Sequence, residues 1–258
     1  MAEVTQAPVA RDAEAAPVIS VRGAGIRFKR NRSSRRSFKD LFAGRNRRTR
    51  PGEFWALRDV DFDVMPGEAI GVVGRNGQGK STLLKLVAQV VYPDEGRVSV
   101  SAGVAPLIEI TGGFVGDLSV RDNVYLTAGL HGMTRREIDE RFDEIIEFAE
   151  IADFVDTPYK HLSSGMKVRI AFAVISRLEE PIILVDEVLA VGDKAFRDKC
   201  YTRIEELLAG GRTLFFVSHS ERDLLRFCAR GLYLDKGALV LDAPIREVVD
   251  RYNADYGS

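Results

Sequence analysis

The chain has 258 residues, with 37 Lys and Arg side chains against 38 Asp and Glu side chains and a formal net charge of −1. This length fits one α/β domain with appended segments and a sizeable core, and the balanced charge gives no indication of nucleic-acid binding. No stretch of the sequence reaches the roughly 18 consecutive apolar residues of a membrane span, so no span is predicted.

The first strand is predicted near residues 18–22, and residues 25–28 form its continuation or a second short strand. Residues 1–17 are rich in Ala, Pro and Glu and are expected to be a disordered tail. Because they lack an apolar segment, they do not resemble a signal peptide. Two cysteines, Cys200 and Cys228, are too few for a disulfide framework, and we expect buried free thiols in a reducing cytosol.

A basic block occupies residues 29–50, with ten basic side chains and a single acid. Within the block, Phe38, Leu41 and Phe42 have the spacing of one face of a short amphipathic helix. Three apolar residues are too few to anchor a helix alone, so we expect something outside the domain to cover them. The alternative interpretation is a solvated basic loop.

Residues 54–64 alternate between apolar and polar and predict a half-buried strand. The chemistry is organised around the next motif, which has the spacing G-x-x-x-x-G-K-[ST] and consists of Gly74, Arg75, Asn76, Gly77, Gln78, Gly79, Lys80 and Ser81, followed by Thr82. An apolar strand over 69–73 precedes it and a helix over 81–88 follows, the setting in which loop amides and a helix N-terminus hold phosphate. We expect Lys80 to reach the β- and γ-phosphates of a nucleoside triphosphate and Ser81 to hold Mg²⁺. A glycine-rich turn that binds nothing is the alternative.

Further along the chain, predicted helices alternate with apolar strands. Strands are predicted near 97–100, 104–110, 182–185 and 213–217, with a hairpin over 232–241 that turns at Lys236-Gly237. Helices are predicted near 119–130, 134–151, 163–177, 194–209 and 244–253. The alternation indicates a largely parallel core sheet, and the helices between 119 and 177 are expected to form a second lobe.

Two carboxylates, Asp186 and Glu187, end the apolar strand 182–185. Adjacent residues of an extended chain point in opposite directions, so the two can have separate functions. We expect Asp186 to hold Mg²⁺, directly or through water, and Glu187 to orient or deprotonate the attacking water. In isolation, a solvated acidic pair at a strand end would be the preferred interpretation.

Two further polar sites are weaker signals. The stretch LSSGM, residues 162–166, opens a helix and offers N–H donors and a hydroxyl to an anion, although Ser-Gly before a helix is usually only a cap. His219 follows the strand 213–217, and a polar residue at the mouth of a parallel sheet faces the ligand crevice. A lone histidine is more often structural than catalytic.

The order GRNGQGKST, LSSGM, IILVDE, AVGD and SHS, over about residues 18–242, resembles the ATP-binding cassette (ABC) ATPases. The resemblance implies a P-loop NTPase of the α/β class, with a mostly parallel core sheet, an antiparallel β subdomain and a helical lobe. It also implies a homodimer that encloses two ATP molecules, in which Ser164 and Gly165 of one chain complete the other chain's site. Residues 190–193 correspond to the D-loop of the family, and His219 corresponds to its switch histidine.

A narrower resemblance connects FWALRDVDF, SSGMKVRIAFA, VDEVLAVGD and FRDKC to the ATPase subunits of polysaccharide exporters. These subunits drive export of O-antigen, capsule or teichoic acid on lipid carriers through a separate membrane permease. The group has an extra segment between its first strands, often with a short helix that faces the permease, and residues 29–50 match it in place and character. This segment is therefore expected to meet the membrane or the lipid-linked substrate.

The chain departs from the usual ABC pattern at two positions. Where the family has a glutamine in the loop between lobes, this sequence has Glu109, which can coordinate Mg²⁺ but cannot donate as an amide does. The aromatic residue that stacks on adenine, usually a tyrosine, is Phe28 by position. Phe54 and Trp55 are alternatives, because an aromatic residue at a strand end is often only part of the core.

These resemblances imply a peripheral ATPase on the cytoplasmic face of the inner membrane, with ATP and Mg²⁺ as ligands. The expected partners are a second copy, a permease and a lipid-linked polysaccharide, with no nucleic acid. The domain is expected over 18–242, followed by a C-terminal helix and tail over 243–258 and by no carbohydrate-binding domain. One alternative is the cassette of a different transporter, which moves lipids, drugs or ions. Two others are a soluble cassette that functions in translation or DNA repair, and a small-molecule kinase.

Overall fold

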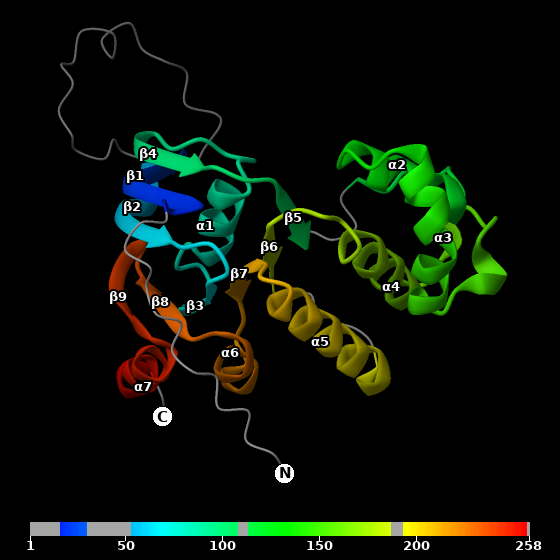
Figure 1. Ribbon diagram of the computed structural model, residues 1–258. Coiled ribbons are helices and arrows are strands. Elements are labelled where there is room, and N and C mark those ends of the chain that lie inside the picture. Colours follow the sequence, from blue (N-terminus) through cyan, green and yellow to red (C-terminus); the bar gives the residue numbers. More distant parts are fainter. Residues whose placement is uncertain (1–15, 30–52, 108–112, 187–192, 257–258) are drawn as a thin grey trace, which may run out of the picture.

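A computed structural model describes residues 16–29, 53–107, 113–186 and 193–256. Within these ranges the chain forms a three-stranded sheet, a six-stranded sheet and a group of helices set to one side (Figure 1). The predicted α/β class, with a mostly parallel core sheet, an antiparallel sheet and a helical lobe, is confirmed. None of the helices in the described part of the chain combines the length and apolar character that a membrane crossing requires.

The small sheet is antiparallel and has the order β2-β1-β4, with β1 at Ile19–Lys29, β2 at Glu53–Val64 and β4 at Glu95–Val100. The two segments expected at 18–22 and 25–28 form a single strand, whose register shifts between Val21 and Ala24. Gly23 lies in this shift with a φ of 54°, a backbone conformation that glycine adopts without steric cost. One continuous β1 therefore pairs with both neighbours.

The large sheet has the order β5-β6-β7-β3-β8-β9. Its strands are β5 (Val104–Leu107), β6 (Ile182–Val185), β7 (Thr213–Val217), β3 (Ala69–Val73), β8 (Arg230–Asp235) and β9 (Ala238–Pro244). All neighbours are parallel except β8 and β9, which pair as the predicted hairpin. Every residue of β6 and β7 is buried, as expected for central strands covered on both faces.

Helices cover both faces of the large sheet. On one face, α1 (Lys80–Val87) and the small sheet pack in one apolar core; on the other, α5 (Lys194–Ala209), α6 (Glu221–Phe227) and α7 (Ile245–Tyr256) pack in a second (Figure 1). The short helix α6 is absent from the sequence prediction. Because α6 has only seven residues, its apolar face is too short to show a clear helical period. Its N-cap is Ser220, whose side chain accepts a hydrogen bond from Asp223 N–H.

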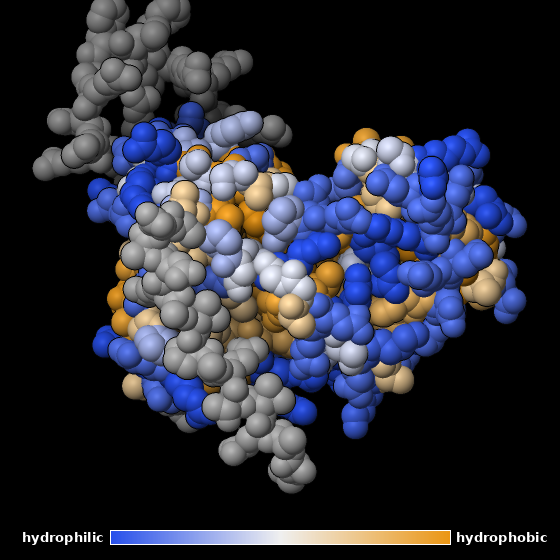
Figure 2. All heavy atoms as spheres, in the orientation of Figure 1, coloured by the Kyte–Doolittle hydropathy of each residue, from blue (hydrophilic) through white to orange (hydrophobic). Residues whose placement is uncertain are grey.

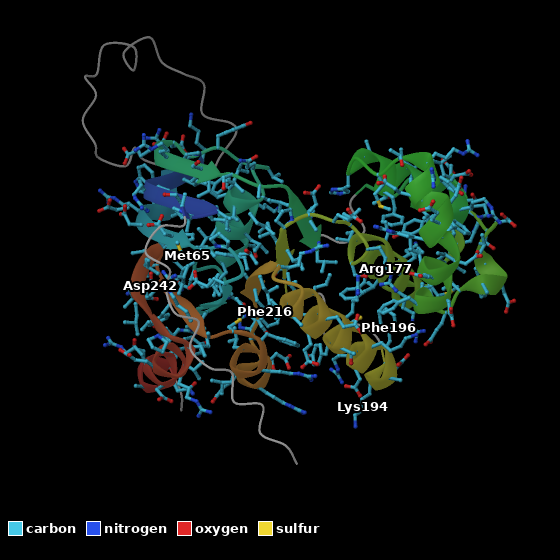
Figure 3. All side chains as sticks on the ribbon, viewed as in Figure 1. Met65, Arg177, Lys194, Phe196, Phe216 and Asp242 are labelled. Atoms are coloured by element: carbon cyan, nitrogen blue, oxygen red, sulfur yellow. The ribbon has the colours of Figure 1, made fainter. Side chains whose placement is uncertain are left out.

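The helical lobe consists of α2 (Val120–Leu130), α3 (Arg135–Ala149) and α4 (Ser164–Ile175), which share an apolar core. The predicted cap of α3 is confirmed, because Thr134 and Glu137 form a reciprocal capping box. On the face shown in Figure 2, the lobe is largely hydrophilic, with scattered hydrophobic residues between the polar ones. Phe196 of α5, labelled in Figure 3, packs against Phe148 of α3 and Phe172 of α4 and so joins the lobe to the core.

Both cysteines are buried and free, as predicted. Cys200 lies on α5, and Cys228 directly follows α6. Burial raises the pKa of the Cys200 thiol to about 12. Both side chains therefore act as small apolar groups of the core that lies under α5, α6 and α7.

Candidate nucleotide-binding site

Three adjacent strands of the large sheet deliver the predicted polar residues to one edge. The motif 74–82 follows β3, Asp186 follows β6, and Ser218 and His219 follow β7. Because β6, β7 and β3 are neighbours and parallel, their carboxyl ends meet at the same edge of the sheet. Segments more than 100 residues apart in sequence therefore converge.

The loop after β3 turns around the side chain of Lys80. Its Nζ donates hydrogen bonds to the carbonyl oxygens of Gly74 at 2.6 Å and Arg75 at 3.1 Å, and the side chain is only 5% exposed. Gly79, with a φ of 104°, precedes α1, and a Cβ there would lie 2.4 Å from the carbonyl oxygen of Ala56. Glycine is therefore required for both conformation and space.

The first turn of α1 is open to an anion. Gly79 at the N-cap provides no side chain to occupy the first amides of the helix, which point toward the loop that precedes them. Backbone amides at a helix N-terminus and the helix dipole together favour a phosphate at this position. The loop thus supplies backbone donors and the cation of Lys80 to the same space.

A cavity of about 510 Å³ lies over the loop, within the size range of small-molecule sites. It is lined by Phe28, Phe54, Ala56, Asn76, Gly77, Gly79, Lys80, Ser81, Thr82 and Asp186. Ser81 and Asp186 are both among these residues, and hydroxyl and carboxylate oxygens are ligands that Mg²⁺ prefers. The donor set therefore fits a magnesium ion held together with phosphate oxygens.

His219 lies beside Lys80, with Nε2 3.5 Å from the ammonium nitrogen. Ser218, the preceding residue, accepts a hydrogen bond from Ser220 N–H at 3.0 Å, so the turn between β7 and α6 is fixed. Both Lys80 and His219 can donate to an anion at the carboxyl edge of the sheet. The contact brings the candidate histidine to the phosphate loop, although it follows a different strand.

The structure separates the three candidates for the adenine-stacking aromatic residue. Phe28 and Phe54 form a pair with ring centroids 5.9 Å apart, are 42% and 40% exposed, and line the cavity. Trp55 is not among the lining residues, and its ring packs against the guanidinium groups of Arg27 and Arg58. Two half-exposed rings at the cavity rim offer a platform for a base.

Replacing Phe28 with alanine is expected to weaken ATP binding about ten-fold, because stacking of a base on an aromatic ring is worth about 1–3 kcal/mol. Binding of inorganic triphosphate, which has no base, should stay unchanged. Calorimetric titration of both ligands measures the two effects, with Trp55→Phe as the control. A larger loss in Phe54→Ala than in Phe28→Ala would transfer the stacking role to Phe54.

Other predicted residues lie away from this cavity or outside the described ranges. Ser164 and Gly165 form the first turn of α4 in the helical lobe, behind the N-cap Ser163, and do not line the cavity. Glu109, Glu187 and residues 190–192 lie outside the described residues, as does the basic block apart from Lys29.

The last residue of the predicted D-loop segment caps a helix. Asp193 is the N-cap of α5 and accepts from Phe196 N–H at 2.9 Å, and Arg169 of α4 pairs with its carboxylate. The hydrogen bond from Phe196, together with the pairing to Arg169, holds the pKa of Asp193 below its usual value. The pairing with Arg169 ties Asp193, at the start of α5, to the helix that begins with Ser164 and Gly165.

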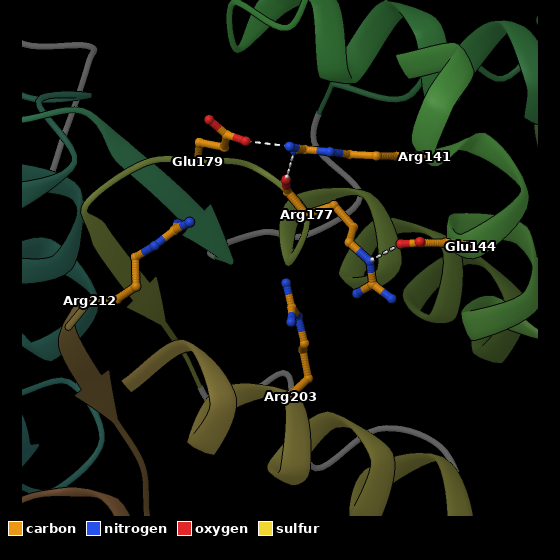
Figure 4. A pocket seen from close by; sticks show the side chains of 6 residues that line it. All are labelled: Arg141, Glu144, Arg177, Glu179, Arg203 and Arg212. Carbon is orange, nitrogen blue, oxygen red and sulfur yellow. Dashed lines mark hydrogen bonds and ion pairs between the residues drawn. The ribbon is translucent and has the colours of Figure 1, made fainter. Parts of the chain in front are cut away.

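A second cavity, of about 270 Å³, lies where the helical lobe joins the core, and shares no lining residue with the first (Figure 4). It is lined by Arg141, Glu144, Arg177, Glu179, Arg203 and Arg212. Arg141 of α3, Arg203 of α5 and Arg212 before β7 donate to backbone carbonyls between 176 and 180. These arginines cap the carboxyl end of α4 and fasten the link from α4 to β6.

Several contacts of the phosphate loop carried no signal in the sequence. Gln78 accepts a hydrogen bond from Lys236 N–H through its side-chain oxygen, and the Arg75 guanidinium lies over the ring of Tyr256. Their partners are more than 150 residues away in sequence, and neither the predicted hairpin turn at Lys236 nor the C-terminal segment indicates a contact with the loop. Only the three-dimensional structure brings β8, β9 and α7 to the loop.

Comparison with known proteins agrees with this geometry. A family model described as ABC transporter matches residues 57–190. The chain is 40% identical over 237 residues to the ABC transporter protein AbcA of Aeromonas salmonicida, covering 92% of this chain and 76% of that protein. It is 42% identical to the O-antigen export system ATP-binding protein RfbB of Klebsiella pneumoniae, covering 78% of this chain and 81% of that protein.

A third relative is longer. The teichoic acids export ATP-binding protein TagH of Bacillus anthracis is 41% identical over 83% of this chain, which spans 38% of TagH. Among solved structures, the ATP-binding cassette MJ0796, bound to ADP and Pi in a dimeric post-hydrolysis state, matches with a TM-score of 0.70 and 22% identity. That match covers 88% of this chain and 99% of the MJ0796 chain. The chain therefore belongs to the ABC transporter family and carries its ATPase domain.

Proposed function

We propose that this chain is the ATP-hydrolysing subunit of an ABC exporter that drives export of a lipid-linked polysaccharide, such as O-antigen, capsule or teichoic acid. The observation that carries the proposal is the similarity of about 40% to proteins named for O-antigen and teichoic acid export, over roughly four fifths of this chain. The alternative within the family is the ATPase of a different lipid, drug or ion transporter.

The cavity supports a division of roles among its residues. The amides of the loop 74–82 and the ammonium of Lys80 hold the phosphates, and Phe28 stacks on adenine. Ser81 and Asp186 hold Mg²⁺, which, when bound, neutralises charge on the β- and γ-phosphates. Glu109 is a further candidate ligand of Mg²⁺ from the sequence alone.

The hydrolytic step needs a base and a phosphate contact. Glu187, the residue after Asp186, orients the attacking water and accepts its proton, while His219 donates to the γ-phosphate beside Lys80. The 3.5 Å contact between Lys80 and His219 supports this pairing, because a phosphate bound by one lies within reach of the other. Bond cleavage then leaves ADP and phosphate.

The working unit is proposed to be a homodimer. Ser164 and Gly165 lie on α4 in the helical lobe and do not line the cavity of their own chain, which supports a role in the site of a partner copy. The cassette spans 18–242, including the helical lobe over 119–177, with a preceding tail over 1–17 and a C-terminal helix and tail over 243–258. The dimer docks beneath a membrane permease, as a peripheral subunit on the cytoplasmic face of the inner membrane.

The basic block 29–50 is proposed to face the membrane or the anionic carrier of the polysaccharide. Its ten basic side chains against one acid favour an anionic surface, since each cation gains roughly 1 kcal/mol near anionic lipid. A lipid carrier that is linked through phosphate is also negatively charged. The proposal rests on the sequence of this segment alone.

Deleting the gene for this chain is expected to remove the polysaccharide from the cell surface and to accumulate lipid-linked polymer inside the cell. The wild-type chain should restore the surface polymer, and Lys80→Ala should not, because the transport step would lack its ATPase. Quantitative blotting of surface and lipid-extracted polymer measures both pools. Lys194→Ala, at an exposed position on α5, serves as the control. Unchanged surface polymer after deletion would favour the lipid, drug or ion alternative.

A further inference from the structure

The last described turn of the C-terminal helix α7 contacts the phosphate loop. The guanidinium carbon of Arg75, the second residue of the loop, lies 5.0 Å from the centroid of the Tyr256 ring, in the geometry of a cation–π pair. The Tyr256 hydroxyl donates a hydrogen bond to Asp235 Oδ1, at the end of β8, at 2.9 Å. The ring is thus fixed at both its face and its hydroxyl.

The turn between β8 and β9 packs on the same loop. The side-chain oxygen of Gln78 accepts a hydrogen bond from Lys236 N–H at 2.5 Å. A Cβ at Gly74 would lie 2.4 Å from the carbonyl oxygen of Leu234, so the backbones of the loop and β8 are in direct contact. The first and fifth residues of the loop are therefore held by β8 and its turn, and the second residue by α7.

Arg75 connects this C-terminal contact to the cation that meets the phosphates. Its guanidinium packs on Tyr256, while its carbonyl oxygen accepts from Lys80 Nζ at 3.1 Å. A displacement of Arg75 therefore alters the position of Lys80, which also donates to the adjacent carbonyl of Gly74. Fixing such a loop before binding lowers the entropic cost of ordering it around a ligand.

We propose that Tyr256 is a positioning residue for ATP: by holding Arg75 against α7, it pre-organises the Gly74–Arg75 carbonyls that orient Lys80. This inference rests on the proposed role of the loop 74–82 as the phosphate site. It assigns α7, which lies outside the motifs of the cassette, a function in nucleotide affinity. Because Tyr256 does not line the cavity, it acts through Arg75 and not on the nucleotide directly.

Replacing Tyr256 with leucine is expected to weaken ATP binding about three- to five-fold, the worth of an exposed cation–π pair expressed as an affinity ratio. Turnover at saturating ATP should remain near that of the wild type, so that KM rises and kcat does not. Tyr256→Phe keeps the ring over Arg75 and should retain most of the affinity. Calorimetric titration and steady-state phosphate release measure the two quantities.

A double-mutant cycle separates this role from a general effect on folding. Arg75→Gln already removes the pair, so adding Tyr256→Leu to it should cause little further loss of ATP affinity. The control is Glu247→Gln, an exposed residue of the same helix, and thermal unfolding of every variant reports the stability of the fold. Full additivity of the two substitutions, or unchanged affinity in Tyr256→Leu, would overturn the proposal.

Lys80→Ala, measured in the same titration, separates a failure of the proposed phosphate site from a failure of the proposed role of Tyr256. If Lys80→Ala binds ATP as the wild type does, the loop is not the phosphate site, and the proposed function of the loop fails first. If Lys80→Ala loses affinity and Tyr256→Leu does not, the loop keeps its function and only the role of Tyr256 is rejected. The expected result is a large loss in Lys80→Ala and a moderate one in Tyr256→Leu.

Discussion

Replacing Lys80 with alanine is expected to lower ATP turnover by about 10²-fold or more and to weaken ATP binding, because a fixed cation against the phosphates is lost. The structure makes the loss large for two reasons. Lys80 is nearly buried where it lines the cavity, so its charge is poorly screened by water, and its ammonium also holds the carbonyls of Gly74 and Arg75. Alanine at this position removes both the charge and the internal bonds of the loop.

Titration with a fluorescent ATP analogue measures the affinity of Lys80→Ala, and phosphate release measures its turnover. Lys194→Ala is a matched control, since it removes a lysine from the exposed first position of α5 on the same domain. The control should behave as the wild type. Equal affinity for ATP in Lys80→Ala and the wild type would show that the loop 74–82 does not hold the phosphates.

Substituting Glu187 with glutamine is expected to lower hydrolysis by about 10²-fold or more while ATP binding stays intact, because an amide cannot accept the proton of the attacking water. Asp186, which follows β6 and lines the cavity, is the proposed ligand of Mg²⁺, and Glu187, the next residue in the sequence, is the proposed base. Substitutions at the two residues should therefore have different effects. Asp186→Asn should raise the Mg²⁺ concentration that hydrolysis requires, and Glu187→Gln should not.

Single-turnover hydrolysis of bound ATP measures the chemical step in Glu187→Gln without contributions from product release. Glu180→Gln is the control, because Glu180 precedes the same strand at its opposite end. Its hydrolysis rate should equal that of the wild type. Wild-type turnover in Glu187→Gln would remove Glu187 from the mechanism and leave the attacking water to another group.

Much of the fold could be predicted because its local signals agree with its tertiary structure. The spacing of the phosphate loop, the apolar runs of β3, β6 and β7, and the capping box of α3 each determine a local conformation that the packed structure retains. The resemblance of the ordered motifs to ABC ATPases then predicted that the strand-end residues share one site. Membership of this family is confirmed by the comparisons.

Contacts between remote segments could not be predicted. No local pattern indicates that Tyr256 packs on Arg75, or that Arg203 and Arg212 donate to the carbonyls after α4. Such contacts depend on the order of strands in the sheet, which places β8 beside β3. The adenine-stacking residue is a similar case, since the sequence offers three aromatic residues, and only the structure shows that Phe28 and Phe54 line the cavity while Trp55 packs against Arg27 and Arg58.

The proposal that two copies of this chain enclose ATP is tested most directly by the mass of Glu187→Gln in sedimentation with and without ATP. Because hydrolysis is blocked in this variant, the ATP-bound state should persist and two chains should close around it. The predicted result is a monomer without nucleotide and a dimer with ATP, whereas the same variant carrying Lys80→Ala stays monomeric. A monomer at high protein concentration, with ATP shown to be bound, would contradict the shared site.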